Sequence, residues 1–202
     1  MVDYSIENEY REKGFDIICG VDEAGRGPLA GPVYAAAVIL PSDCVIEGLN
    51  DSKKLTEKKR EALFDEIKEK ALAYGIASAD EKEIDEINIL NATFLAMKRA
   101  IDSLSVKPDL ALIDGNQKPH TDIEEVTVIK GDAKSTSIAA ASVLAKVSRD
   151  RFMLEMAEKY PQYEFARHKG YGTKLHYEKI AQYGVCNIHR RTFLKKILGE
   201  QK

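Results

Sequence analysis

The sequence predicts an α/β protein built around a single sheet. Short apolar runs rich in β-branched residues alternate along the 202 residues with longer stretches in which apolar residues recur at helical spacing. Three of the apolar runs end near a carboxylate, at Asp22, Asp114 and Asp132. Because open α/β folds bind their ligands at the carboxyl ends of strands, we expect these acids to meet at one edge of the sheet.

The first predicted strand, residues 15–21, leads into a glycine-rich turn with the sequence GVDEAGRGP at residues 20–28. Its β-branched residues and closing glycine indicate a buried strand that ends near Asp22. The apolar run at residues 32–41 is bounded by prolines and predicts a second strand. Residues up to about Gly14 are polar and charged, which indicates a short helix or an arm.

A helix, a strand and a second helix are expected next. The charged stretch at residues 57–73 has helical spacing and follows Thr56, a favourable N-cap residue. Residues 73–79 predict a third strand, and an acidic patch at residues 80–86 begins a helix that extends to about residue 104. The residues expected on the apolar faces of the two helices are Leu63, Ile67 and Ala71 in the first, and Ile87, Leu90, Phe94 and Met97 in the second.

Two further strands are predicted at residues 108–114 and 126–132, each with an acid at its end. A helix from residue 133 to about residue 159 follows, with small residues near its start that allow close packing on the sheet. Its buried face is predicted to contain Ala140, Leu144, Val147 and Leu154, and its basic residues Lys134, Lys146, Arg149 and Arg151 are expected to be solvated or paired at the surface.

We predict a division at Pro161, with a catalytic domain at residues 1–160 and a basic, helical substrate-binding segment at residues 161–202. A helix is expected at about residues 173–183 in the second part. The formal net charge is −3, yet the chain from Arg167 onward contains nine Lys and Arg and only two Asp and Glu. A basic segment on an acidic body is typical of an enzyme that holds a nucleic-acid backbone, although a solvated tail fits the charge equally well.

The composition argues against secreted and membrane-bound classes. No apolar run approaches the roughly 18 residues that a membrane span needs, and the first residues lack the basic-then-apolar pattern of a signal peptide. The three cysteines are widely spaced, which fits reduced thiols better than disulfides or a zinc site. We therefore expect a cytoplasmic protein, and nothing in the sequence requires more than a monomer.

Four acids, Asp22, Glu23, Asp114 and Asp132, predict a divalent metal site. Together they provide oxygen ligands without His or Cys, a set that suits Mg²⁺ or Mn²⁺ and not zinc. Two such ions about 3.5–4 Å apart would support phosphodiester hydrolysis. Other interpretations stay open: a tight turn with solvated acids, a turn-forming role for Asp114 before its glycine and, more weakly, a dinucleotide-binding loop.

Arg26 and Tyr171 are candidate substrate-binding residues. Arg26 lies between Gly25 and Gly27, so that backbone amides and a guanidinium are able to approach a sugar-phosphate edge. Tyr171 lies among basic and glycine residues, and its ring offers a surface for stacking a sugar or base. The alternative for Tyr171 is an aromatic side chain that fills a gap between helices.

The motifs together resemble those of ribonuclease HII, an enzyme family that cuts RNA within RNA–DNA duplexes and at single ribonucleotides in DNA. The matching stretches are GVDEAGRGPLAGPV at 20–33, DSKKL at 51–55, IDGN at 113–116, KGDAKSTSIAAASVLAKVSRDR at 130–151 and HKGYGT at 168–173. The resemblance implies an RNase H-like fold, a mixed central β-sheet flanked by helices, with a small C-terminal helical segment that closes over the substrate.

The same resemblance implies roles for individual residues. Asp22, Glu23, Asp114 and Asp132 match the family's catalytic and metal-binding acids. The Gly25-Arg26-Gly27 element is implied to read the 2′-hydroxyl that distinguishes RNA from DNA. Tyr171 is implied to pack against the deoxyribose that follows the ribonucleotide.

The implied activity is that of a Mg²⁺- or Mn²⁺-dependent endoribonuclease that cleaves the RNA strand of RNA–DNA hybrids. It would nick duplex DNA on the 5′ side of an embedded ribonucleotide, leave 3′-hydroxyl and 5′-phosphate ends, and serve ribonucleotide removal. Two competing hypotheses are a non-catalytic nucleic-acid-binding module and a nuclease that acts on DNA alone. The end of the chain, at residues 193–198, lacks the paired-aromatic motif for a sliding clamp, and we expect no such partner.

Overall fold

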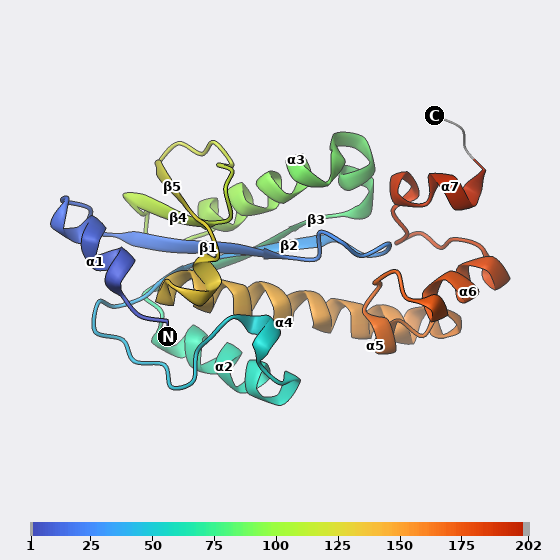
Figure 1. Cartoon of the computed structure of the whole chain (residues 1–202), viewed down its shortest axis with the longest axis horizontal. Helices are drawn as coiled ribbons and strands as arrows, with labels where there is room; N and C mark the ends of the chain where they lie inside the picture. The colour runs from blue at the N-terminus through green and yellow to red at the C-terminus, as the bar shows by residue number, and fades with distance from the viewer. Residues whose placement is uncertain (1, 200–202) are drawn as a thin grey trace.

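One mixed sheet of five strands organises the molecule (Figure 1). The structure is a computed structural model and describes residues 2–199; Met1 and residues 200–202, at the outer ends of the two predicted parts, lie outside the described residues. The strand order is β3-β2-β1-β4-β5, with β1 antiparallel to β2 and parallel to β4. The strands are β1 Ile18–Ala24, β2 Val33–Ile39, β3 Ala73–Ala79, β4 Leu110–Asp114 and β5 Glu124–Val128. The predicted α/β class with a mixed sheet is confirmed.

The helices cover both faces of this sheet. Their bounds are α1 Ser5–Glu12, α2 Glu57–Lys70, α3 Glu81–Asp102, α4 Thr136–Lys159, α5 Phe165–His168, α6 Lys174–Tyr183 and α7 Lys195–Leu198, with 3-10 turns η1 Ser52–Lys54, η2 Gly131–Ala133, η3 Pro161–Tyr163 and η4 Arg191–Phe193. Figure 1 shows α3 on one side of the sheet and α4 on the other, with α2 beyond α4. None of the helices described within residues 2–199 is long and apolar enough to cross a membrane.

Alternating side chains of the strands pack into two hydrophobic cores, one on each face of the sheet. Cys19 and Val21 of β1 pack in the cluster beneath α3, whereas Ile18 of the same strand packs in a cluster that contains Ile138 of α4. Gly20 lies between these residues, and a Cβ at this position would overlap the backbone of Ser137. The glycine therefore lets the start of α4 lie directly against β1, beside the segment that contains the acids.

Helix α1 is fixed to the same region. Glu7, which is 1% exposed, accepts hydrogen bonds from the backbone N–H of Ser137 at 2.9 Å and from the hydroxyls of Ser135 and Ser137. A carboxylate at a helix N-terminus satisfies free N–H groups and complements the helix dipole. The N-terminal residues predicted to be a helix or an arm are thus a helix that caps α4.

The predicted strand ending at Asp132 is displaced. Strand β5 ends at Val128, and Asp132 lies in η2, after Lys130 has turned the chain with a φ of 57°. The β-branched residues continue to Ile129 in the sequence, beyond the observed end of the strand. β-Propensity alone therefore predicted a longer strand. The acid still reaches the sheet edge, because the 3-10 turn folds back toward β4.

The predicted helix faces are only partly correct. Asn88, with a φ of 69°, interrupts α3 and changes the face that it presents, so Met97 is buried while Ile87, Leu90 and Phe94 are half-buried. In α4 the residues Ala140, Leu144 and Val147 are buried as predicted, but Leu154 is 38% exposed. In α2, Leu63 and Ile67 are buried, and Ala71 is the half-buried C-cap.

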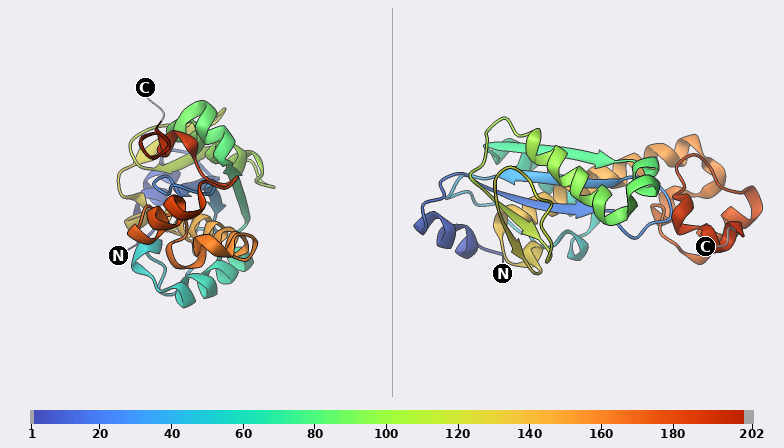
Figure 2. Two further views of the ribbon diagram at one scale, coloured as in Figure 1. Left: turned by 90° about the vertical axis from the view of Figure 1, so that its right-hand side faces the viewer. Right: turned by 90° about the horizontal axis from the view of Figure 1, so that it is seen from above.

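The last part of the chain gathers at one end of the molecule. The right panel of Figure 2 shows α5, α6 and α7 beyond the end of the sheet that lies opposite α1. This segment has its own small apolar cluster, which includes Tyr163, Phe165 and Ile188 together with Met153 of α4. The shared cluster attaches the segment firmly to α4.

Candidate metal and nucleic-acid site

Three carboxylates from separate parts of the chain meet beside the sheet. Asp22 comes from β1, Asp114 from the end of β4 and Asp132 from η2. One carboxylate oxygen of each lies within 4.8 Å of the other two. The parallel pairing of β1 with β4 brings the first two together, since Val21 is the register partner of Ile113.

Backbone hydrogen bonds fix the third acid. Asp114 Oδ1 accepts from the backbone N–H of Gly131 at 2.6 Å and from that of Asp132 at 3.4 Å. One side chain thus positions the turn that contains another member of the cluster. Asp22 Oδ1 accepts from the backbone N–H of Glu23 at 2.7 Å, so both strand acids hold defined orientations.

The acids repel one another strongly in the absence of a cation. Burial raises the pKa of Asp22 well above its ordinary value, and the charges of Glu23 and Asp114 add to the effect. Burial, followed by the charge of Asp114, likewise raises the pKa of Asp132. Carboxylates in this situation are stabilised in their charged form when a metal ion lies between them.

The donor set fits a hard divalent cation. Asp22 is 4% exposed, Asp132 is 7% exposed and Asp114 is half-buried. No His or Cys accompanies them in the cluster found among residues 2–199. All-oxygen sites of this kind suit Mg²⁺ and related ions. The three clustered aspartates are therefore suited to hold a divalent metal ion.

Glu23, the fourth predicted acid, lies at the margin of this cluster. Its Oε1 is 3.6 Å from Arg26 Nη1, and it lines a small hollow together with Arg26, Asp114 and Asn116. Burial raises the pKa of Glu23, while Arg26 opposes the rise. The structure therefore joins the acidic cluster to the predicted substrate-binding turn through this side chain.

Two residues near the acids were not predicted as site residues. Lys53 Nζ is 3.7 Å from Asp132 Oδ2, and Asp51 accepts a hydrogen bond from the backbone N–H of Lys53 at 2.9 Å. Burial alone would lower the pKa of Lys53, but the charges of Asp22 and Asp132 raise it. The motif DSKKL at residues 51–55 carries part of the family resemblance, and the fold places it at the border of the acidic cluster.

A buried arginine holds the turn at residues 25–31. Arg190 is 0% exposed and donates to three carbonyl oxygens of this turn, those of Gly25 at 2.6 Å, Arg26 at 2.9 Å and Gly31 at 2.8 Å. The planar guanidinium matches this arrangement of acceptors. The carbonyls consequently point inward, and the Arg26 side chain stays half exposed.

Arg149 corrects the prediction that the basic residues of α4 lie at the surface. It is fully buried and donates to the carbonyl oxygens of Ala30, Pro32 and Lys169 at 3.1–3.2 Å. A Cβ at Gly25, where φ is 102°, would overlap the Arg149 side chain. The acceptors that surround the Arg149 guanidinium come from residues far away in the chain, so helical spacing alone gave no sign of its burial.

Tyr171 lies next to this turn. The backbone N–H of Leu29 donates to the carbonyl of Gly170 at 2.8 Å, and the Arg149 guanidinium lies 5.6 Å from the centre of the Tyr171 ring. The side chain is 43% exposed. This exposure argues against the alternative in which Tyr171 fills a gap between helices, and it leaves the ring available to a ligand.

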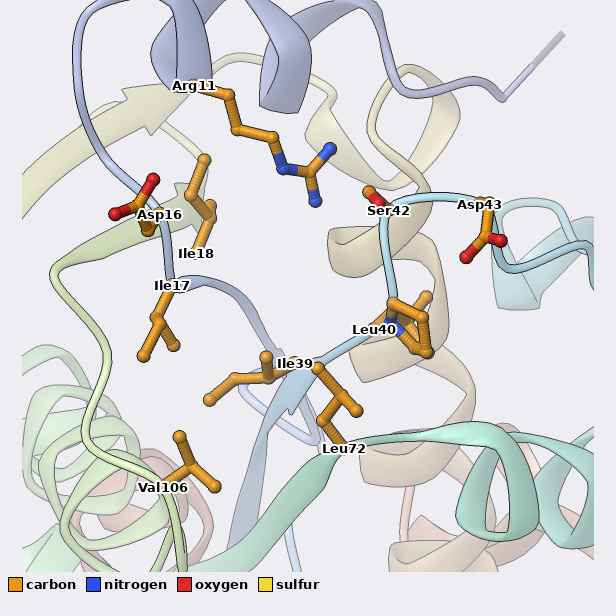
Figure 3. Close-up of a pocket in the computed structure, with 11 residues that line it drawn as sticks. Arg11, Asp16, Ile17, Ile18, Ile39, Leu40, Ser42, Asp43, Leu72 and Val106 are labelled. Atoms are coloured by element: carbon orange, nitrogen blue, oxygen red, sulfur yellow. The ribbon is translucent and has the colours of Figure 1, made fainter.

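A larger hollow of about 580 Å³ lies at the other end of the strands (Figure 3). Its walls come from the start of β1, the end of β2 and Arg11 of α1. Ile18 lines it, four residues along β1 from Asp22, and none of the clustered acids takes part. Volume alone therefore does not identify the site; the convergence of charged groups does.

The fold and the acidic cluster together define an RNase H-like nuclease. A solved ribonuclease H2 from Pyrococcus horikoshii is 29% identical to this chain, with a TM-score of 0.76 over 92% of this chain and 97% of that one. A ribonuclease HIII solved with Mn²⁺ shares the fold with a TM-score of 0.64, at 18% identity over 83% of this chain and 63% of that one.

The chain belongs to the ribonuclease HII family. The family model described as Ribonuclease HII matches residues 19–196. The ribonuclease HII of Caldicellulosiruptor bescii is 58% identical over 97% of this chain and 95% of the relative, and that of Acetivibrio thermocellus is 60% identical over 95% and 75%. The protein is therefore an endoribonuclease with ribonuclease H activity toward RNA–DNA hybrids.

Proposed function

We propose that the chain nicks duplex DNA on the 5′ side of an embedded ribonucleotide, leaves 3′-hydroxyl and 5′-phosphate ends, and serves ribonucleotide removal. The observation that carries the proposal is that the acidic cluster is connected to the turn at residues 25–31, and that this turn is connected to the loop that contains Tyr171. Glu23 and Arg26 connect the cluster to the turn, and Arg149 connects the turn to the Tyr171 loop.

Asp22, Glu23, Asp114 and Asp132 would hold Mg²⁺ or Mn²⁺, most simply as a pair of ions. Ions bound there supply Lewis-acid stabilisation of the charge that develops as a phosphodiester is hydrolysed. The chain itself contributes a rigid frame, because Asp114 and Asp132 are fixed to each other through the backbone of η2. Lys53 adds a positive charge at the border of the cluster.

Gly25, Arg26 and Gly27 would read the sugar of the ribonucleotide. Gly27 has open space where a Cβ would lie, so a nucleic-acid backbone is able to approach the turn. A 2′-hydroxyl is both donor and acceptor, and it is the group that separates RNA from DNA. Tyr171 would pack on the adjoining deoxyribose, so that the RNA–DNA junction is recognised by two elements at once.

A nicking assay tests this function. A duplex DNA that contains one ribonucleotide is incubated with the protein and Mg²⁺ or Mn²⁺, and the ends of the products are mapped. We expect a single nick on the 5′ side of the ribonucleotide, no cleavage of the matched all-DNA duplex, and loss of nicking after chelation. Nicking that survives chelation, or equal cleavage of the all-DNA duplex, would contradict the proposal.

A further inference from the structure

Three histidines are buried together in the C-terminal segment. His168, His176 and His189 are 7%, 0% and 3% exposed, and no role in the metal site is assigned to any of them. The rings of His168 and His176 stack with their centres 4.3 Å apart, while His176 Nε2 lies 3.1 Å from His189 Nε2. Phe165 packs edge-on against His168 and His176.

The hydrogen bonds determine which nitrogen of each ring carries the proton. The backbone N–H of Cys186 donates to His189 Nδ1 at 2.9 Å, so the hydrogen of neutral His189 is on Nε2. This Nε2–H can only donate to His176 Nε2, which leaves the hydrogen of His176 on Nδ1. His176 Nδ1–H then donates to the carbonyl oxygen of Tyr171 at 3.0 Å.

The two rings therefore form a directed connection from Cys186 to Tyr171. His168 supports the same loop separately, because its Nδ1 accepts from the backbone N–H of Gly170 at 3.2 Å while its Nε2–H donates to the carbonyl of Tyr163 at 3.0 Å. Every ring nitrogen of the three histidines has a partner. Such fully satisfied buried networks make one conformation much more favourable than its alternatives.

The connection also joins the two predicted substrate-binding elements. His189 forms an isolated antiparallel bridge with Ala30, and the neighbouring Gly31 N–H donates to the Ile188 carbonyl at 2.8 Å. Residues 188–190 are thus paired with the turn that contains Arg26. The histidine pair, His189 and His176, extends from this pairing to the backbone of Tyr171.

We propose that His189 and His176 are positioning residues that set the placement of Tyr171 relative to the turn at residues 25–31, and so determine affinity for the RNA–DNA junction. The inference rests on the proposed function of Tyr171 as the residue that packs against the junction sugar. Both histidines are buried and would act without contacting substrate, His176 through the Tyr171 carbonyl and His189 through His176. Imidazole suits this role because one rigid ring both accepts and donates.

A double-mutant cycle tests the proposal. The variants are His176→Phe, which keeps a buried ring without the nitrogens, Tyr171→Ala, and the combination of the two. For the single-ribonucleotide duplex we expect His176→Phe to raise KM roughly fivefold, the factor that corresponds to one hydrogen bond of about 1 kcal/mol, with kcat nearly unchanged. The combined variant should be no worse than Tyr171→Ala alone, because both changes act through the same ring.

Two further variants separate positioning from general stability. His176→Asn retains an N–H at the place of Nδ1 and should restore KM toward the wild-type value. Tyr163→Phe removes the hydroxyl that donates to the Gly184 carbonyl at 2.9 Å in the same segment, and should lower Tm without changing KM. If the effects of His176→Phe and Tyr171→Ala multiply, or if Tyr163→Phe raises KM equally, the positioning role is wrong.

Ring-nitrogen NMR of the wild-type protein provides a readout that needs neither activity nor a variant. The arrangement requires Nε2–H on His168 and His189 and Nδ1–H on His176 at neutral pH. An Nε2–H tautomer at His176 would overturn the proposal even if every variant failed to fold. Failure of the wild-type protein to nick the duplex would instead refute the proposed function, and an unchanged KM in Tyr171→Ala would refute the role of the tyrosine.

Discussion

Asp132 is the acid whose replacement separates catalysis from folding most cleanly. Asp114 accepts two backbone N–H groups and so supports η2, whereas the Asp132 carboxylate faces Lys53 and the other acids. Binding of a shared metal ion would require the negative charge of Asp132, whereas the fold does not depend on that charge. The structural cost of removing that charge is accordingly small.

We predict that Asp132→Asn lowers kcat by roughly a hundredfold or more, since loss of one preorganised charge in an active site commonly costs this factor. Substrate affinity should be retained. Because burial, followed by the charges of neighbouring acids, raises the pKa of Asp132, its charged form is disfavoured in the metal-free fold, and the variant should melt at the same or a higher temperature. Steady-state kinetics and metal-free thermal melts check both statements; full activity would contradict the assignment.

For single residues, the sequence predicted the acids from their places at strand ends, but it did not predict burial that depends on the tertiary fold. Four acids at or near strand ends predicted a cluster, and the structure brings three of them within 4.8 Å of one another. Arg149 and Arg190 could not be predicted in the same way. Nothing local to an arginine reveals that carbonyl groups from a distant turn will surround it.

Among the structural elements, the turn at residues 25–31 depends most on a single side chain. Arg190 donates to three of its carbonyl oxygens from a fully buried position. A lysine would keep the positive charge but could not reach all three acceptors with a planar fork. At least one buried carbonyl would lose its partner.

We predict that Arg190→Lys lowers the free energy of unfolding by about 2–4 kcal/mol, given a cost of about 1–3 kcal/mol for each buried group left unsatisfied. Urea denaturation provides the measurement. KM for the ribonucleotide duplex should also rise, because the turn is no longer fixed. Arg191→Lys, at an exposed neighbouring position, serves as the matched control and should change neither quantity.

The histidine pair makes the C-terminal segment sensitive to acid. Burial lowers the pKa of His176 and of His189 to about 4 each, from an ordinary value of 6.5. The unfolded chain binds these protons near pH 6.5, whereas the folded chain stays neutral until about pH 4. Unfolding therefore takes up protons between these two values.

We predict that the free energy of unfolding is constant with respect to these groups above about pH 6.5 and falls as the pH decreases toward about 4. Urea titrations at several pH values across this window check the slope. A variant with both His176→Phe and His189→Phe should show a shallower dependence. An equal slope in wild type and variant would assign the acid sensitivity to other groups.

For the elements, prediction was most accurate where the pattern was strictly local. The β3 bounds were predicted to the residue, and Thr56 caps α2 as expected. Three features depend on what packs against each element: the turn that places Asp132, the interruption of α3 at Asn88 and the exposure of Leu154. Helical spacing cannot show a change of face within one helix.

For the molecule as a whole, the α/β class followed from the alternation of segments, the mixed character of the sheet was implied only by the resemblance, and the strand order was not predicted. Separate strands carry no signal that β1 lies between an antiparallel and a parallel neighbour. The division at Pro161 stays a prediction. Met153 of α4 packs in the cluster of the C-terminal segment, so contacts cross that boundary.

The strand order also governs when the acids come together during folding. The pairings of β1 with β2 and of β2 with β3 join strands that follow one another along the chain. In contrast, β1 must pair with the distant β4, with Ile18 opposite Leu110, before the acids can come together. Pairings distant in sequence are slow to form, and chains of this length commonly pass through partly folded states. We predict that, on dilution from urea, helical circular dichroism recovers before nuclease activity; simultaneous recovery would contradict this.

The same topology acts during synthesis. Asp22 leaves the ribosome early, yet Asp132 is made 110 residues later and the turn-holding Arg190 a further 58 residues after it. A nascent chain therefore lacks the assembled acidic cluster until Asp132 has emerged, and it lacks the side chain that holds the turn at residues 25–31 until Arg190 has emerged.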